Sequence, residues 1–131
     1  MIIIGDSRFD CEQLFLVHNI EDLKSTPSNS VVFIKSQNIK LQTFLANNCV
    51  EYGIFVNDFK EAIYANNLKA KYIICSQTIV DKLQKIAENY LFDAKILALI
   101  DFEEEINKMC EIGVDGVIYG SILKFNELEQ I

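Results

Sequence analysis

The sequence predicts an α/β fold built on a mostly parallel sheet, and three observations lead to that prediction. Short runs of β-branched and aromatic residues recur at intervals of about twenty residues along the 131-residue chain. Most of these runs are apolar on both faces, which is typical of strands buried on both sides of a parallel sheet. Segments with helical periodicity separate the runs. Together they indicate about six βα units in a single domain, residues 1–131.

The expected strands are the seven apolar runs. In chain order they are 2–5, 14–17, 31–34, 52–56, 72–75, 96–100 and 116–120. Their length of about four to six residues is that of ordinary strands in globular proteins.

Three of the intervening segments carry an apolar stripe at helical spacing, which predicts helices packed against a sheet. The clearest is 78–91, with the stripe Ile79, Val80, Leu83, Ile86, Ala87, Tyr90 and Leu91. The second, 58–68, has the stripe Phe59, Ala62, Ile63 and Leu68. The third, 101–112, has the stripe Phe102, Ile106, Met109 and Cys110. All of these residues are expected in the core.

Polar residues predict where the helices begin. Asp58 and Asp101 are each followed three residues later by a glutamate, which resembles a capping box, and Asn19 with Asp22 is a weaker version. The phrase FIKSQN at 33–38 returns as IICSQT at 73–78. We interpret the recurring serines, Ser36 and Ser76 together with Ser121, as the points where strands give way to helices.

Two arrangements of such units satisfy the right-handed crossover rule. Helices on both faces would form a doubly wound three-layer sandwich, and helices on one side would form a partial βα barrel. A full eight-unit barrel needs about 250 residues, so this chain is too short for one. The sandwich is the preferred prediction and the partial barrel is the alternative.

The charge balance, the length of the apolar stretches and the cysteine spacing each argue against a class of function. The chain has 19 acidic and 12 basic residues, a net charge of −7, and no basic cluster, so nucleic-acid binding is not expected. No stretch reaches the roughly 20 apolar residues of a membrane span. The four cysteines are scattered without a C-x-x-C pair and there is one histidine, so we expect reduced thiols, no metal site and a cytoplasmic protein.

Candidate site residues follow from the fold, because ligands of parallel α/β proteins gather at the carboxyl ends of the strands. No Ser-His-Asp set, phosphate-binding glycine loop or zinc-protease motif is present, so we name no catalytic residue and no cofactor. The turn at Gly120 could present backbone N–H groups to a phosphate. The candidate ligand-binding residues are Arg8, Lys35, Ser36, Ser76, Gly120 and Ser121.

From Val31 onward the chain resembles a response-regulator receiver domain, which has a flavodoxin-like fold. The resemblance is clearest in 96–131, where Gly113-Val114-Asp115-Gly116 fills the turn before the last strand. The reactive positions differ from the family. Lys35 and Ser36 stand in place of the acidic pair, Cys75 and Ser76 in place of the phosphoacceptor, and Gly120 and Ser121 in place of Lys-Pro. The resemblance therefore implies a receiver-like module without phosphoryl transfer, whose partner surface would be 119–131.

The opening DSRFDCEQLFLV, residues 6–17, is similar to the start of the N-terminal domain of Mur ligases, which docks the uridine end of a nucleotide-sugar precursor. Asp101-Phe102-Glu103 stands where the ATP loop of those enzymes should follow, so ligase activity is not expected. The segment GVDGVIYGSIL, 113–123, also resembles the phosphate-binding last strand of sugar-phosphate barrels.

Two functional hypotheses remain. The first is a non-catalytic cytoplasmic binding or regulatory module that contacts a protein partner or itself. The alternative is a small-molecule site for a nucleotide-sugar or sugar-phosphate ligand at the carboxyl ends of the strands. The sequence leaves an enzymatic activity open and favours none.

Overall fold

The structure is a computed structural model, and it describes residues 1–10 and 12–123. In this part of the chain seven parallel strands form one sheet, in the order β1-β7-β6-β5-β4-β3-β2. The strands are β1 (Ile2–Ile4), β2 (Leu14–Leu16), β3 (Val31–Ile34), β4 (Tyr52–Phe55), β5 (Tyr72–Cys75), β6 (Lys95–Ile100) and β7 (Gly116–Tyr119). Every expected strand is confirmed, with bounds that differ by one residue at most.

Helices connect the strands from β3 to β7. They are α1 (Ile39–Asn47), α2 (Phe59–Asn67), α3 (Gln77–Asn89) and α4 (Glu105–Ile112). Two short 3₁₀ helices complete the described elements, η1 (Ile20–Ser25) between β2 and β3 and η2 (Gly120–Leu123) after β7. The α/β class and the parallel sheet are therefore as predicted.

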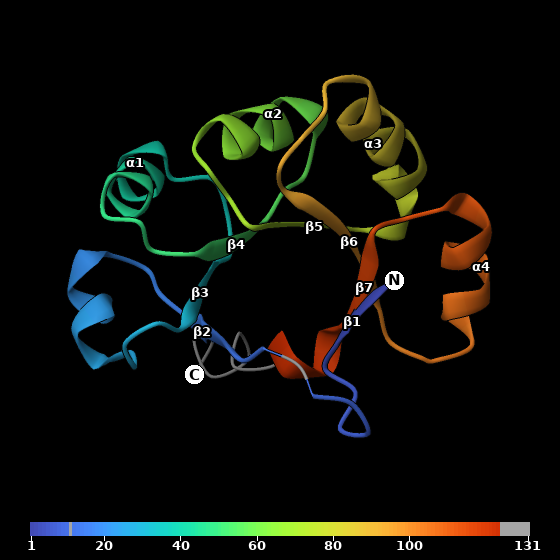
Figure 1. The fold of residues 1–131 in the computed structure, drawn as a ribbon, viewed down its shortest axis with the longest axis horizontal. Helices are drawn as coiled ribbons and strands as arrows, with labels where there is room; N and C mark the ends of the chain where they lie inside the picture. Colours follow the sequence, from blue (N-terminus) through green and yellow to red (C-terminus); the bar gives the residue numbers. More distant parts are fainter. Residues whose placement is uncertain (11, 124–131) are drawn as a thin grey trace.

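The sheet curls into a half-barrel, with α1 to α4 around its outer, convex side (Figure 1). From β2 to β7 each new strand is added on the same side of the previous one, so right-handed crossovers place every helix on the same face. A doubly wound sheet needs a reversal of this order, which is absent between β2 and β7. Of the two arrangements considered, the strand order is thus that of the alternative, the partial barrel.

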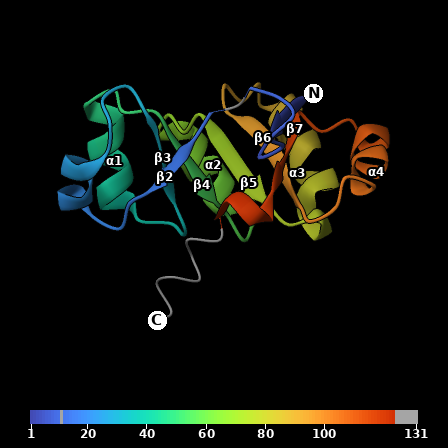
Figure 2. The ribbon, with the colours of Figure 1, turned by 90° about the horizontal axis from the view of Figure 1, so that it is seen from below.

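β1 departs from the sequential order. It pairs with β7 at one edge of the sheet, whereas β2 forms the opposite edge. The chain between them crosses the open side of the curl, where η2 also lies (Figures 1 and 2). Because all strands are parallel, this crossing leads from the carboxyl end of β1 back to the amino end of β2.

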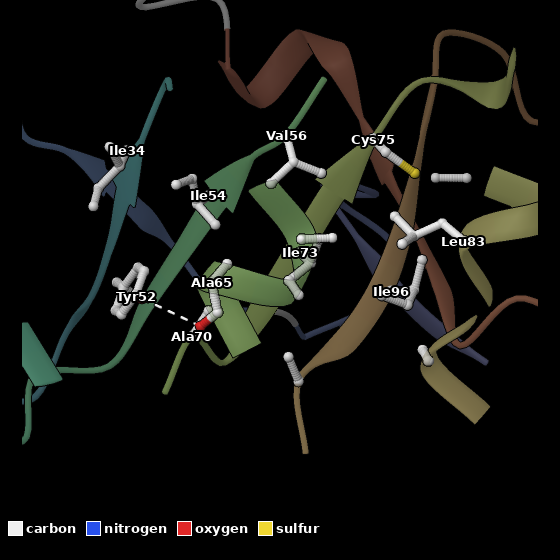
Figure 3. Packing of buried hydrophobic residues seen from close by; sticks show 14 of the residues in the cluster. Ile34, Tyr52, Ile54, Val56, Ala65, Ala70, Ile73, Cys75, Leu83 and Ile96 are labelled. Carbon is white, nitrogen blue, oxygen red and sulfur yellow. Dashed lines mark hydrogen bonds between the residues drawn. The ribbon is translucent and has the colours of Figure 1, made fainter. Parts of the chain in front are cut away.

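Each face of the sheet has its own apolar core, as the runs without alternation predicted. On the convex face Ile54, Ile73 and Ile96 pack with Leu83 of α3 and other helix residues (Figure 3). On the concave face Phe33 and Leu97 lie in a smaller cluster of buried residues. Its members are Ile4, Leu14, Val31, Phe33, Tyr72, Ile74, Leu97, Ile118 and Leu123.

Not every residue of the predicted stripes is buried. Tyr90 and Leu91 follow the end of α3 and are exposed, and Ile63 and Cys110 face solvent from α2 and α4. Phe102 lies before α4 instead of inside it, and its side chain is exposed too. At Tyr90, Leu91 and Phe102 the stripe patterns were wrong because the helix ends earlier, or begins later, than periodicity alone suggests. Ile63 and Cys110 lie inside their helices, on a side that faces solvent.

The predicted helix starts were partly right. Asp58 caps α2, since its Oδ1 accepts from the N–H of Glu61 at 2.9 Å and Glu61 Oε1 accepts from the N–H of Asn57 at 2.9 Å. Asn19 caps η1 in the same way, accepting from the N–H of Asp22 at 3.0 Å. Asp101 does not cap α4, which begins at Glu105.

The recurring serines have different roles. Ser76 is the N-cap residue of α3, yet its hydroxyl bonds to the Thr78 hydroxyl, at 2.6 Å, instead of accepting from a backbone N–H of the helix. The prediction for Ser36 was wrong by two residues, because Asn38 caps α1 by accepting from the N–H of Leu41 at 3.1 Å. Ser121 lies inside η2.

We predict that Gly116→Ala destabilises the fold by about 1–3 kcal/mol through overpacking. A Cβ at Gly116 would lie 2.5 Å from the carbonyl oxygen of Ile2 and 2.8 Å from Leu97 Cδ2, so β1 would have to move away from β7. Chemical denaturation measures the loss, and hydrogen exchange of the β1 amides should accelerate. Gly53→Ala is the control, because its Cβ would make ordinary contacts of 3.4 Å or more. Equal losses in the two variants would contradict the prediction.

We predict that Tyr52→Phe costs about 1 kcal/mol of unfolding free energy, the usual net value of one hydrogen bond. The buried Tyr52 hydroxyl donates to the carbonyl of Leu68 at 2.8 Å, and Gln42 Nε2 donates to that hydroxyl at 3.4 Å. Removing the hydroxyl leaves both buried groups without this partner. Tyr64→Phe, on the exposed side of α2, should change nothing measurable in the same urea titration.

Candidate functional site

The carboxyl ends of the seven parallel strands lie along one rim of the half-barrel. All predicted site residues are on this rim, because each follows a strand directly or within four residues. Arg8 follows β1, Lys35 and Ser36 follow β3, Ser76 follows β5, and Gly120 and Ser121 open η2 after β7. These residues therefore share the edge formed by the carboxyl ends of the strands, while their role in binding stays a prediction.

The strand order brings only part of this set together. Arg8 and Gly120 belong to the neighbouring strands β1 and β7, whereas two strands separate β1 from β5 and four separate it from β3. Gly120 lies beside β6, where a Cβ on it would be 3.1 Å from Asp101 Oδ1. Ser76, Lys35 and Ser36 belong to other sections of the rim. The predicted residues therefore do not form one constellation along the sheet.

The best-defined group on the rim is an ion-pair cluster around Arg8. Its Nε donates to Asp6 Oδ1 at 2.9 Å and its Nη2 donates to Asp6 Oδ2 at 2.6 Å, a bidentate arrangement. The same Nη2 donates to Glu103 Oε2 at 2.7 Å, which ties the loop after β1 to the loop after β6. The backbone N–H of Arg8 also donates to Asp6 Oδ1, at 3.0 Å.

These contacts shift the pKa values of both Asp6 and Arg8. The hydrogen bonds from the Arg8 side chain, and then from its backbone N–H, lower the pKa of Asp6 to about 2. The hydrogen bonds to Asp6 and then to Glu103 raise the pKa of Arg8 above its ordinary value. Asp6 is therefore ionised at neutral pH and cannot serve as a general acid there. Arg8 already has two anionic partners.

Two exposed phenylalanines flank the cluster. Phe9 follows Arg8 and is 54 % exposed, and the Arg8 guanidinium lies 6.0 Å from its ring centre. Phe102 precedes Glu103 and is 66 % exposed. A shallow hollow of about 360 Å³ is lined by Phe102, by other residues of the loops after β1 and β6, and by Tyr119. We name Arg8, Phe9, Phe102 and Glu103 the aromatic rim.

Acidic side chains border the aromatic rim. Asp101 and Glu104 are exposed and belong to no ion pair within the described ranges. Glu105, in contrast, has hydrogen-bond partners within the protein. Its carboxylate accepts from Gln77 Nε2 at 2.5 Å and from the N–H of Asp101 at 3.3 Å. This section of the surface is therefore predominantly negative.

Cys75 lacks the features of a catalytic thiol, and His18 takes part in a helix cap through its backbone. Cys75 is fully buried at the end of β5, and burial raises the pKa of its thiol to about 12, so the thiolate is scarce at neutral pH. His18 is exposed before η1, and its backbone N–H donates to Asp22 Oδ2 at 2.7 Å as part of the cap.

A second polar network lies at the opposite, amino-terminal ends of the strands. Glu12 accepts from Lys71 Nζ at 3.0 Å and from the hydroxyl of Tyr72, and Lys71 also pairs with Glu51 at 3.5 Å. Burial, and then the contact with Glu12, raises the pKa of Tyr72. Partial burial of Glu12 would raise its pKa, but the bonds from Tyr72 and Lys71 prevail and lower it. The network fastens the chain that crosses from β1 to β2.

Of the aromatic rim, only Arg8 was among the candidate residues predicted from the sequence. Phe102 fitted a helical stripe and was assigned to the core. The useful signal is the position of Phe9 and Phe102, each within a short polar segment that follows a strand.

We predict that Asp6→Asn lowers the melting temperature at neutral pH and has a smaller effect as the pH falls. A carboxyl group with a depressed folded-state pKa stabilises the protein above its unfolded value of about 3.9, and this contribution is lost as the pH falls through about 2. Thermal melts of both proteins between neutral pH and pH of about 2 measure the difference. Asp10→Asn, an exposed residue of the same loop, should show no such trend. A difference that stays constant with pH would contradict the prediction.

Among the described residues, no group of three His, Cys, Asp or Glu side chains is arranged to hold a metal ion. In the same part of the chain, no helix has both the length and the apolar character needed to cross a bilayer. No known protein family and no curated protein matches the sequence.

Proposed function

We propose that the chain is a non-catalytic binding module that contacts a positively charged protein segment through the aromatic rim. The single observation that carries this proposal is the exposure of two phenylalanines, 54 % and 66 %, which are sequence neighbours of the two members of the fixed Arg8–Glu103 pair. Aromatic residues and arginine are enriched in the energetically dominant parts of protein interfaces. The two rings contribute little to the stability of the fold, because more than half of each side chain stays accessible to water.

The rigidity of the site supports a binding role. Asp6 and Glu103 together hold the Arg8 side chain, and the Arg8–Glu103 pair links two loops that are 95 residues apart in sequence. Side chains already ordered before binding lose less conformational entropy when a partner arrives. The Arg8 guanidinium lies 6.0 Å from the ring centre of Phe9, and Phe102 precedes Glu103 in the chain, so both rings belong to loops that this fixed pair holds.

The charged side chains around the aromatic rim indicate which kind of partner would bind there. Asp101 and Glu104 are exposed beside Phe102, and the whole chain carries a net charge of −7. Carboxylates next to exposed rings suit lysine or arginine side chains, which can pair with the acids and lie over the rings. A basic segment with apolar side chains is therefore the best match.

The receiver resemblance is compatible with this proposal but does not carry it. It placed the partner surface at 119–131, of which only Tyr119 to Leu123 lie in the described residues. The residue differences that argue against phosphoryl transfer apply equally to a module that only binds. Location in the cytoplasm stays a prediction from composition.

The small-molecule alternative has weaker support. It relied on Arg8 and Lys35 as cations for a phosphate-bearing ligand. Arg8 already pairs with two carboxylates, and four strands separate β1 from β3 in the sheet. A melting screen with UDP-sugars and sugar phosphates tests it, because a ligand at a hundred times its Kd stabilises by about 2.7 kcal/mol.

Site-specific photo-crosslinking tests the proposal. With p-benzoylphenylalanine in place of Phe102, we expect a discrete adduct with a basic protein segment in cells that express the chain. The same probe at Tyr64, an exposed residue of α2, is the matched control and should give no such adduct. Phe9→Ser should then weaken binding to the captured segment about tenfold or more, and added salt should weaken it further. Identical adducts from both positions, or none from Phe102, would refute the proposal.

A further inference from the structure

A buried glutamine of α3 has a hydrogen-bond donor that the fold does not use. The side chain of Gln84 is 4 % exposed, and its Oε1 accepts from the backbone N–H of Asp115 at 3.0 Å. That bond fixes the orientation of the amide group. Its Nε2 has no hydrogen-bond partner in residues 1–10 and 12–123. Because a buried donor without a partner costs free energy, an acceptor that is not part of the described chain is expected beside Nε2.

The same glutamine lines a hollow of about 380 Å³. The hollow lies at the amino ends of β6 and β7, beside the turn that follows α3, so it is separate from the aromatic rim. Its volume is within the range of pockets that hold small molecules. The apolar part of its lining consists of Ala87, Leu91, Phe92 and Ala94.

The leucine in this lining is not explained by folding. Leu91 is 83 % exposed and follows the C-cap residue of α3 with a φ of 53°, in the left-handed region that favours glycine and asparagine. It therefore bears the cost of an unfavourable backbone conformation and buries almost none of its side chain in return. What it does supply is apolar surface at the hollow.

The charges around the hollow are mixed, and carboxylates outnumber ammonium groups. Lys95, Glu88 and Asp115 line the hollow, and Asp93 is exposed on the same turn. None of these four side chains forms a salt bridge within the described part of the chain. The carboxylate of Asp115 is held in place, since its Oδ2 accepts from the N–H of Ile96 at 2.9 Å.

We propose that this hollow binds a free apolar α-amino acid. The carboxylate of the ligand accepts from Gln84 Nε2 and pairs with Lys95. Its ammonium group pairs with the carboxylates of Asp115 and Glu88, and its side chain packs against Leu91. The ligand thus supplies the acceptor that the buried amide lacks and a cation for the excess of negative charge.

Ligands with one charge fit the hollow less well. A simple amine would leave Gln84 Nε2 without an acceptor and would add a second cation near Lys95. A simple carboxylic acid would face three carboxylates with no cation of its own to pair with them. The zwitterion satisfies both sets of groups at once.

A titration with L-leucine, followed by heteronuclear NMR, tests the proposal on the side-chain NH2 signal of Gln84. We expect that signal to shift saturably, with a Kd in the millimolar range or tighter. The analogue 3-methylbutylamine lacks the carboxylate and 4-methylpentanoate lacks the ammonium group, so each should bind about tenfold more weakly or worse. A Gln84 signal that millimolar leucine leaves unchanged, or equal binding of either analogue, would overturn the proposal.

The amino-terminal residue of a peptide shares part of this chemistry. L-Leucinamide separates the two sources, because it keeps the ammonium group and the side chain but has no carboxylate for Lys95. It should bind about tenfold more weakly than leucine. Equal binding of leucinamide would assign the hollow to the end of a peptide and reject the free amino acid.

Two variants test the lining without burying a new group. Lys95→Met should weaken leucine binding about tenfold, and Leu91→Asn about threefold. Asparagine tolerates the left-handed conformation, so the melting temperature of Leu91→Asn should stay equal or rise. Lys82→Met, exposed elsewhere on α3, and Lys69→Asn, in the same kind of turn after α2, are the matched controls and should keep the natural affinity. Natural affinity in a folded Lys95→Met or Leu91→Asn would contradict the assignment.

The amino-acid site and the aromatic rim can be tested separately. Lys95→Met should leave the photo-crosslink from Phe102 unchanged, because the two sites lie at opposite ends of the strands. Phe102→Ser should likewise leave the leucine titration unchanged.

Discussion

The close approach of β1 to β7 is the contact on which the candidate site depends. Ile2 lies opposite Gly116 in the ladder, and its carbonyl oxygen occupies space that any larger residue at Gly116 would need. This approach makes β1 the neighbour of β7 instead of β2. It thereby directs the loop after β1 toward the loop after β6, where Arg8 meets Glu103 at 2.7 Å. Without that pairing, Asp6 and Arg8 would have no partner from the rest of the rim.

The position of β1 also leaves the half-barrel open. A sheet whose strands follow one another in a single direction curls with its helices outside, and β1 and β2 become its two edges. The chain that joins them must cross the open side, and the Glu12 network with Lys71 and Tyr72 fastens it there. The same crossing brings Leu14 to the concave core.

The best-defined groups on the rim have a fixed ionisation state. Arg8 and Asp6 neutralise each other, and the only thiol at a described strand end, that of Cys75, is buried with a raised pKa. In this state Arg8 links the loop after β1 to the loop after β6. The aromatic rim also has exposed aromatic area and neighbouring negative charge, and the proposed function rests on these properties.

Two of the exposed apolar residues, Phe102 and Leu91, were interpreted as core in the sequence. Phe102 and Leu91 each continue an apolar stripe at helical spacing, but the real helix begins after Phe102 and ends before Leu91. Periodicity reports which side of a helix a residue would occupy, and it says nothing about where the helix stops. At a helix end the backbone turns, and the side chain that would have been buried faces water.

The sequence by itself determined the strands, the burial of both sheet faces and the common rim of the candidate residues, because these follow from local apolar runs and from parallel pairing. It also identified Asp58 as a helix cap, since a capping box involves only neighbouring residues. Only the tertiary structure decided the strand order, and with it the half-barrel and the meeting of Arg8 with Glu103. Strand order depends on contacts between segments far apart in the chain, such as Ile2 against Gly116, and no local pattern encodes which distant strand lies beside which.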